Sequence, residues 1–275
     1  MMIALTPLTT IAAKEFRDRI RNRWVVAVAI LFALFALVIA WFGAAQQGSV
    51  GFRGIGPTIA SLTSLVIYLL PLIALILGFD SIVGERERGS LDLLASMPLT
   101  WFELVLGKYL GLALALTVAT IAGFGVAAIA MLPSLDANAA FHYGGFVLSA
   151  LLLGYAFLSL AFLISVYATD RARAGALAIA LWFILVLAFD LLLLGAMVMV
   201  GDRAGAPLIL AMLLNPADVF RILNIFSSDE LTAFYGLATV LPGWLTHPGV
   251  LGGVMLGWIV LPLALATHRF RQHHG

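Results

Sequence analysis

Residues 24–45 read WVVAVAILFALFALVIAWFGAA, an apolar run that contains no charged residue. A transmembrane α-helix needs ~20 apolar residues, whereas a barrel strand needs only ~9–11 residues with alternating polarity. Tryptophan rings favour the interface between headgroups and hydrocarbon, and Trp24 and Trp41 lie near the two ends of the run. The run therefore predicts a helix that crosses a membrane.

The composition of the whole chain extends this prediction. Of its 275 residues, 63% are hydrophobic and 11% are charged, whereas a soluble domain carries roughly 25% charged residues. Backbone N–H and C=O groups find no partner in hydrocarbon, so such a chain must form helices or a closed barrel. Because its apolar runs have helix length, we expect an all-α integral membrane protein. The absence of cysteine excludes disulfides, and a net charge of +1 offers no basic excess for nucleic acid.

The chain contains six such segments and is predicted to form one membrane domain over residues 1–275. The predicted spans cover about residues 24–45, 58–82, 104–132, 144–168, 175–200 and 249–267. Residues 5–23 have apolar side chains every three or four positions and basic side chains elsewhere, which is typical of an amphipathic helix in the headgroup plane. Residues 201–248 form the longest loop, in which the apolar pieces are too short to cross alone.

The positions of lysine and arginine predict the orientation of these spans. Six spans place twelve basic residues on one side and three on the other. The twelve are Lys14, Arg17, Arg19, Arg21, Arg23, Arg86, Arg88, Lys108, Arg171, Arg173, Arg269 and Arg271, and the three are Arg53, Arg203 and Arg221. Basic residues concentrate on the cytoplasmic side, so both termini are predicted to be cytoplasmic.

The loop between the second and third spans carries several helix signals. From Glu85 it reads ERERGSLDLLASMPLTWFELVLGK. Ser90 suits the start of a helix and Pro98 its end, so a short cytoplasmic helix is predicted over residues 90–97. Thr100 and Glu103 have the spacing of a capping box for the helix that becomes the third span.

This loop resembles the signature of the ABC-2 type permeases, the membrane subunits of one class of ATP-binding cassette exporters. In that family a Glu-rich stretch leads into Gly-Ser, a Leu-rich short helix and a proline, and then Gly-Lys. The matching residues are Glu85, Glu87, Gly89, Ser90, Leu91, Leu94, Pro98, Gly107 and Lys108. The amphipathic first helix, six spans, long loop and basic tail are also similar, so the resemblance covers nearly the whole chain.

The resemblance implies that the loop couples the chain to an ATPase. The implied coupling residues are Glu85, Arg86, Glu87, Arg88, Gly89, Ser90, Leu91, Leu94, Met97 and Pro98. Two copies of the chain would form the translocation path, and residues 90–97 of each would dock on one of two cytoplasmic ATPase subunits. The chain has no Walker A sequence, so ATP and magnesium would bind to that separate ATPase and no cofactor to this chain. The implied location is the bacterial inner membrane.

A narrower resemblance concerns residues 215–221, which read NPADVFR, and the apolar tract before them. These are similar to the branch of the family that supports maturation of nitrous oxide reductase together with a periplasmic partner protein. The resemblance implies export of a sulfur species or another factor for assembly of the copper centres. The alternatives are a general ABC-2 exporter of a lipid, drug or peptide, and a membrane scaffold for a periplasmic assembly factor.

Two features of the last two spans are candidate sites. Asp190 lies inside the fifth span, where a charge costs roughly 2.5–3.5 kcal/mol unless it faces protein or water, so it is either a functional residue or a structural hydrogen-bonding group. Gly249, Gly253 and Gly257 recur every four residues along the sixth span and predict a surface for close helix packing, within the chain or with a second copy.

The charged residues of the long loop form a third candidate site. They either bind a periplasmic partner or keep the loop solvated, and they are Asp218, Arg221, Asp229 and Glu230. No Ser/His/Asp set, His-Glu-x-x-His motif or phosphate-binding loop is present, so neither catalytic nor metal-binding residues are predicted. The sequence therefore favours a transport subunit over an enzyme.

Overall fold

The structure, a computed structural model, describes residues 5–21, 23–42, 55–91, 99–132, 136–200, 210–225 and 247–274. These residues form helices and short turns, and no strand occurs among them. The elements are α1 (Leu5–Arg21), α2 (Trp24–Phe42), α3 (Ile55–Gly78), α4 (Val83–Glu87), α6 (Trp101–Met131), α7 (Ala137–Tyr167), α8 (Arg171–Trp182), the π-helix η3 (Phe183–Ala188), α9 (Phe189–Val200), α11 (Pro216–Ile225) and α13 (Pro248–His274).

Six helical segments are long and apolar enough to cross a membrane. They are Trp24–Phe42, Thr58–Glu87, Trp101–Met131, Ala137–Tyr167, Arg171–Ala196 and Pro248–Gln272. The predicted all-α membrane fold with six spans is therefore confirmed.

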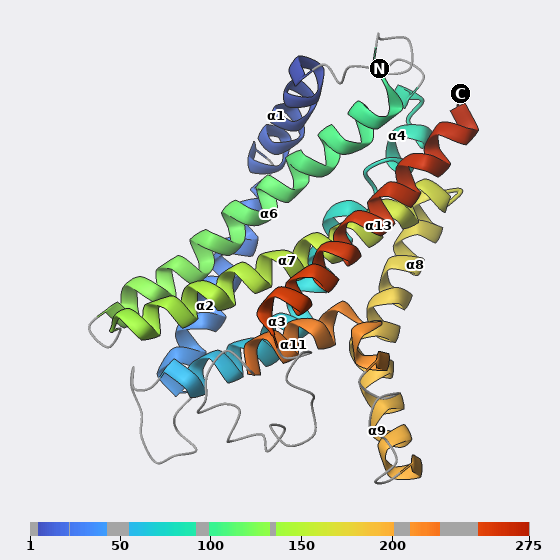
Figure 1. The fold of residues 1–275 in the computed structure, drawn as a ribbon. Helices are drawn as coiled ribbons and strands as arrows, with labels where there is room; N and C mark the ends of the chain where they lie inside the picture. The colour runs from blue at the N-terminus through green and yellow to red at the C-terminus, as the bar shows by residue number, and fades with distance from the viewer. Residues whose placement is uncertain are drawn as a thin grey trace.

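The spans form a bundle around α6 and α7. The most extensive contacts join α2 and α1 to α6, and α13 and α3 to α7. Figure 1 shows α8 continuing through η3 into α9 along one side of this bundle. It also places α1, α4 and the C-terminal end of α13 at the same end of the molecule, which we call the basic end.

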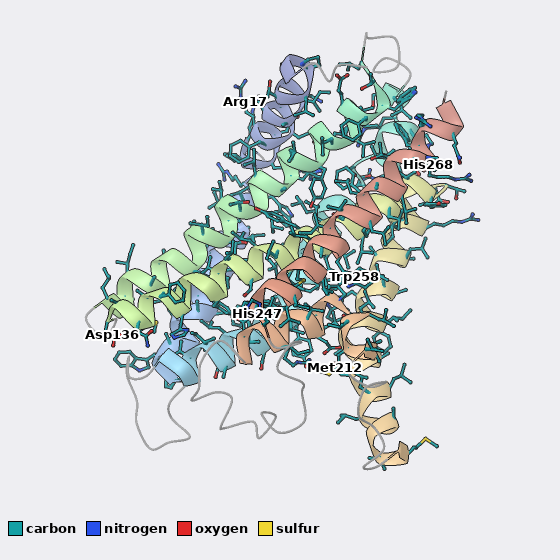
Figure 2. The ribbon with its side chains drawn as sticks, viewed as in Figure 1. Arg17, Asp136, Met212, His247, Trp258 and His268 are labelled. Atoms are coloured by element: carbon teal, nitrogen blue, oxygen red, sulfur yellow. The ribbon has the colours of Figure 1, made fainter. Side chains whose placement is uncertain are left out.

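Local capping signals fix where two of the spans begin. Thr100 Oγ1 accepts the N–H of Glu103 at 3.2 Å, and Glu103 Oε2 accepts the N–H of Thr100 at 2.9 Å, so the capping box predicted at α6 is confirmed. Asp136 caps α7 by accepting the N–H of Ala139 at 2.7 Å, and α7 therefore begins before the predicted span. Figure 2 places Asp136 at the end of the bundle opposite to Arg17 and His268.

A chain of phenylalanine rings crosses the core from α2 to α11. Ring centroids are 5.2 Å apart between Phe32 and Phe124, 5.4 Å between Phe124 and Phe146, and 6.2 Å between Phe146 and Phe220. All four side chains are fully buried. The core thus extends through α6 and α7 into α11, so this short helix is part of the bundle.

Close helix packing at glycine occurs on the third span rather than on the sixth. A Cβ atom added at Gly111 of α6 would lie 2.6 Å from the carbonyl oxygen of Ala12 in α1, so only glycine allows this approach. Added Cβ atoms at Gly253 and Gly257 would meet nothing within 4 Å, and one at Gly249 would meet only the neighbouring His247 ring. Within the described residues no helix of the chain covers this stripe, because α13 faces α7 with its other side, so packing against a second copy stays a prediction.

Candidate functional site

Lys108, near the start of α6, forms ion pairs with carboxylates from two other elements at the basic end. Its Nζ atom lies 2.6 Å from Oε1 of Glu15 in α1 and 2.7 Å from Oε1 of Glu85 in α4. The Lys108 side chain is only 4% exposed, and both glutamates are buried. Since a charge removed from water needs close partners, one ammonium group holds α1, α4 and α6 together.

This cluster has one positive and two negative groups. Lys108 offers three N–H donors, and the carboxylates share them. The second carboxylate oxygen of Glu85, Oε2, has no hydrogen-bond partner among the described residues. Removal of the lysine charge would therefore leave two buried carboxylates without their shared counter-ion.

The turn that leads into α4 is bonded to the end of α7. Ser165 Oγ accepts the backbone N–H groups of Ile82, at 2.9 Å, and of the following residue, at 3.1 Å. In return, the Arg86 guanidinium donates to the carbonyl oxygens of Ala168, at 3.0 Å, and Val166, at 3.3 Å. Each helix end thus satisfies backbone groups that the other helix leaves without an internal partner.

The start of α8 is bonded to the same turn. Glu87 Oε1 accepts the N–H of Arg171 at 2.8 Å, where the helix dipole favours a negative group. Arg171 Nε lies 2.7 Å from Oδ1 of Asp80, just before α4. Asp170 caps α8, and the N–H that Arg173 donates to its carboxylate at 2.8 Å holds the pKa of Asp170 below its usual value.

Gly89 turns the chain out of α4. Its φ of +69° lies in the left-handed region that favours glycine. The Ser90 hydroxyl then donates to the carbonyl oxygen of Glu85 at 3.3 Å, and Leu91 packs into the main core. Residues 92–98 lie outside the described part of the chain, and with them the predicted coupling residues Leu94, Met97 and Pro98.

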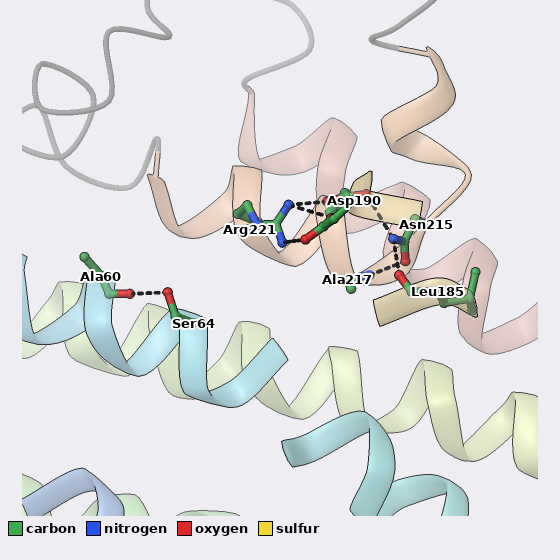
Figure 3. A network of polar contacts seen from close by, with 8 residues as sticks. Ala60, Ser64, Leu185, Asp190, Asn215, Ala217 and Arg221 are labelled. Atoms are coloured by element: carbon green, nitrogen blue, oxygen red, sulfur yellow. Dashed lines mark hydrogen bonds and ion pairs between the residues drawn. The ribbon is translucent and has the colours of Figure 1, made fainter. Parts of the chain in front are cut away.

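A second charge cluster lies where α11 meets the fifth span (Figure 3). The Arg221 guanidinium makes two bonds to the Asp190 carboxylate, from Nη1 to Oδ1 at 3.1 Å and from Nη2 to Oδ2 at 2.7 Å. Arg221 Nη1 also lies 2.6 Å from Oδ1 of Asp218, one turn earlier in α11. Such two-bond guanidinium–carboxylate pairs are stronger and more directional than single bonds.

Asn215 links this cluster to the irregular turn of the fifth span. Its Nδ2 atom donates to Asp218 Oδ2 at 2.9 Å and to the carbonyl oxygen of Leu185 at 2.7 Å. Leu185 lies in η3, where i→i+5 hydrogen bonds replace the ordinary α-helical ones. The amide of Asn215 therefore satisfies a backbone group within the π-helical segment.

The buried position of α11 changes the pKa of the Asp218 carboxyl group. Asp218 is 0% exposed, and burial raises its pKa to about 6. Asn224 of α11 donates to Ser149 Oγ in α7 at 3.0 Å, and the Trp258 indole N–H of α13 donates to the carbonyl oxygen of Leu213 at 3.1 Å. The region around α11 is thus bonded to three spans.

The fold of six apolar helices agrees with comparisons to known proteins. The family model described as ABC-2 family transporter protein matches residues 9–274. The chain belongs to the ABC-2 transporter family. The ABC transporter permease protein NosY of Pseudomonas aeruginosa is 44% identical to this ABC-2 protein over 270 residues, which cover 96% of this chain and 97% of that protein. NosY of Stutzerimonas stutzeri is 40% identical over 267 residues, which cover 95% and 97% of the two chains. The chain is therefore a NosY-like permease subunit of an ABC transporter.

In this ABC-2 permease, the structure brings together only part of the predicted coupling residues. Glu85 is buried in the junction of α4 with its neighbouring helices, and Arg86 and Glu87 bond to the ends of α7 and α8. Glu87, Arg88 and Gly89 are exposed. Leu91, which was also predicted to contact the ATPase, is 3% exposed and packs inside the chain in this conformation. The contact of the exposed residues with an ATPase stays a prediction.

The charged residues of the long loop were predicted to bind a periplasmic partner or to keep the loop solvated, and two of them lie elsewhere. The Asp218 carboxylate is fully buried and Arg221 is bonded to Asp190, because α11 packs into the bundle rather than lying in a solvated loop. Asp229 and Glu230 lie outside the described residues. Among the residues that the structure describes, no group of three His, Asp or Glu side chains is placed to hold a metal ion.

Sequence reasoning missed one residue of these clusters, Glu15, and the partner of another, Asp190. Glu15 was not singled out, although it lies on the face of α1 that Leu8 and Ala12 mark as apolar, which is an unusual place for a carboxylate. Asp190 was a candidate, but its pairing with Arg221 was not predicted because Arg221 was assigned to the long loop. The available signal for Glu15 was an acidic residue at a position where the helical spacing of Leu8 and Ala12 predicts an apolar one.

Proposed function

We propose that this ABC-2 permease converts ATP hydrolysis by a separate ATPase into movement of its spans. The supporting observation is the bonding of the α4 turn, defined here as residues 79–91. Lys108 joins this turn to α1 and α6, and Arg86 and Glu87 join it to α7 and α8. A push on the residues that follow α4 therefore acts on several helices at once rather than on a free loop.

The proposed orientation places the basic end in the cytoplasm, with the chain in the bacterial inner membrane. Twelve of the 15 lysine and arginine residues fall on the side that contains this end. Basic residues next to spans favour the cytoplasmic side, and α1 and the end of α13 both lie there (Figure 1). Both termini would then be cytoplasmic, where a soluble ATPase can reach the α4 turn.

The proposed transporter contains two copies of this chain and two ATPase subunits that hold ATP and magnesium. Only 11% of the fifth span is buried within this chain, and Leu191, Leu192 and Leu194 in its second half are exposed, which leaves an apolar surface there for a second copy. A periplasmic accessory protein would contact the loop between the fifth and sixth spans, for which Asp229 and Glu230 remain the candidate residues.

The proposed cargo is a sulfur species or another factor that is exported for assembly of the copper centres of nitrous oxide reductase. Support comes from the two NosY relatives, which match nearly the whole chain at 44% and 40% identity. The residues 215–221 that carried the narrower resemblance form the start of α11 and the Arg221 cluster. The role of the chain would be transport, with no chemistry of its own.

A gene deletion tests this assignment. In the deletion strain we expect nitrous oxide reductase to be made but to lack intact copper centres, as read from its metal content and visible spectrum. The wild-type gene should restore them, and the tagged permease should co-purify with an ATPase. A normal reductase in the deletion strain would remove the maturation role and leave a general ABC-2 exporter, whereas the lack of any ATPase in the purified complex would favour a scaffold.

A further inference from the structure

A groove between α7, α8 and α13 opens on the outer surface of the bundle near the basic end. Its volume is about 410 Å³, which lies within the ~300–1,000 Å³ range of ligand sites. Its walls are almost entirely apolar and include Leu163, Tyr167, Leu177, Leu181, Ile184 and Leu265. Neither the α4 turn nor the Arg221 cluster contributes a side chain to it, so the function proposed above leaves it unassigned.

A guanidinium group lies at the rim of this groove. Arg269 of α13 lies over the ring of Tyr167, with its Cζ atom 5.4 Å from the ring centroid. Among the described residues Arg269 has no carboxylate within ion-pair distance, whereas Arg171 and Arg173 at the same end each have one. The groove therefore combines an apolar channel with a cation that lacks a counter-ion.

We propose that the groove binds one acyl chain of an anionic phospholipid and that Arg269 holds the phosphate of its headgroup. A guanidinium group matches the geometry of phosphate oxygens, and basic pockets between spans are suited to anionic headgroups. No acidic side chain among the described residues lines the groove, so a choline cation would find no partner there and a headgroup with net negative charge is favoured. This inference does not depend on the proposed ATPase coupling or cargo.

A phospholipid fits this site better than a second copy of the chain. Three acidic groups of the basic end are already paired, since Asp80 bonds to Arg171, Asp170 to Arg173 and Glu85 to Lys108. A second copy would therefore bring none of these carboxylates free to neutralise Arg269. A lipid phosphate supplies the missing negative charge together with a chain that fills the apolar groove.

Native mass spectrometry of the full-length chain in mild detergent tests the proposal. The chain is titrated with phosphatidylglycerol and with phosphatidylcholine that have the same acyl chains. We expect Arg269→Gln to weaken retention of phosphatidylglycerol about fivefold, the contribution of one basic residue next to an anionic surface. Arg271→Gln, the matched control two residues away, should retain it like the wild type.

Two variants test the apolar part of the site. Ala180→Trp and Leu265→Trp fill the groove from opposite walls. The melting temperature shows which of the two variants is folded like the wild type, and a variant so folded should lose retention of both lipids. Equal retention by the wild type, the filled variants and Arg269→Gln would overturn the proposal, because the lipid would then be non-specific annular lipid. The chain lacks cysteine, so Leu177→Cys introduces a single thiol in the groove. Disulfide-linked dimers of this variant in native membranes would show that a second copy covers the groove and would also overturn the proposal.

Discussion

Asp190 in the fifth span and Arg221 in α11 form a two-bond ion pair, with Arg221 Nη2 only 2.7 Å from Asp190 Oδ2. Arg221 belongs to the loop between the last two spans, so the pair fixes part of that loop to the bundle. A carboxylate within a span is costly unless it is paired, and Arg221 supplies the pairing. Asp218 contacts the same guanidinium, which makes Arg221 the shared cation of the cluster.

Replacement of Arg221 by leucine should be more damaging than replacement of Asp190 by asparagine. Arg221→Leu leaves the buried Asp218 carboxylate and the partly exposed Asp190 carboxylate without their cation and should cost about 3 kcal/mol or more. Asp190→Asn leaves Arg221 paired with Asp218 and should cost less. Melting temperatures of the purified chain compare the two variants.

The double variant Asp190→Asn/Arg221→Leu is the control for a direct interaction. Residues in one ion-pair network show coupling energies of about 0.5–3 kcal/mol, so the double variant should be less destabilised than the sum of the single variants. Strict additivity would show that the two side chains do not interact in the protein.

The stability of the folded chain should depend on pH through the titration of Asp218. Burial raises its pKa from 3.8 to about 6, so the folded chain binds this proton more tightly than the unfolded chain does. The contribution of Asp218 to stability therefore falls as pH rises from about 4 to about 6. The melting temperature of the wild type minus that of Asp218→Asn, which does not titrate, should increase from about pH 7 to about pH 5. A difference that stays flat or decreases would show that Asp218 is not a buried acid with a raised pKa.

Two glycine-to-alanine substitutions should differ in their effect on stability, because one glycine is closely packed and the other faces open space. Gly111→Ala would place a methyl group 2.6 Å from the carbonyl oxygen of Ala12 and should cost about 1–3 kcal/mol by forcing α1 away from α6. Gly253→Ala is the matched control, since nothing lies within 4 Å and alanine is the better helix former by about 1 kcal/mol. Thermal unfolding of both variants checks this order, and equal stability would contradict the packing of α1 on α6.

The sequence alone was sufficient to predict those parts of the fold that a local signal determines. The uncharged run after Trp24 predicted the first span, and the Thr100–Glu103 spacing predicted a capping box that the structure contains. Long-range contacts could not be predicted in this way. Lys108 and Glu15 are 93 positions apart, and their contact depends on how α1 packs against α6.

The glycine stripe and the charged residues of the long loop show the same limit of prediction from sequence. The spacing of Gly249, Gly253 and Gly257 identifies a smooth face of a helix, but not which helix covers it. Likewise, the charges of Asp218 and Arg221 predicted exposure, because a single sequence does not reveal that α11 returns into the bundle.

Replacement of Lys108 by methionine should destabilise the basic end. The change keeps a side chain of similar length but leaves Glu15 and Glu85 buried without their shared cation, at a cost of about 3–5 kcal/mol. Lys14→Met removes an exposed lysine of α1 and should change stability little. Melting temperatures of the two variants make the comparison, and similar values would place Lys108 outside the network that holds the junction together.

The most direct test of coupling through Lys108 follows ATP-dependent movement at the far end of the bundle. Leu214→Cys introduces a single exposed thiol next to α11 in the cysteine-free chain, and its rate of labelling by a membrane-impermeant maleimide is measured with and without ATP in the complex with the ATPase. The assay is run at a temperature at which every variant is folded. We predict an ATP-dependent change in labelling rate in the parent protein and in Lys14→Met, and its loss in Lys108→Met while bound ATPase still hydrolyses ATP. The same ATP-dependent change in Lys108→Met would contradict transmission through the Lys108 junction.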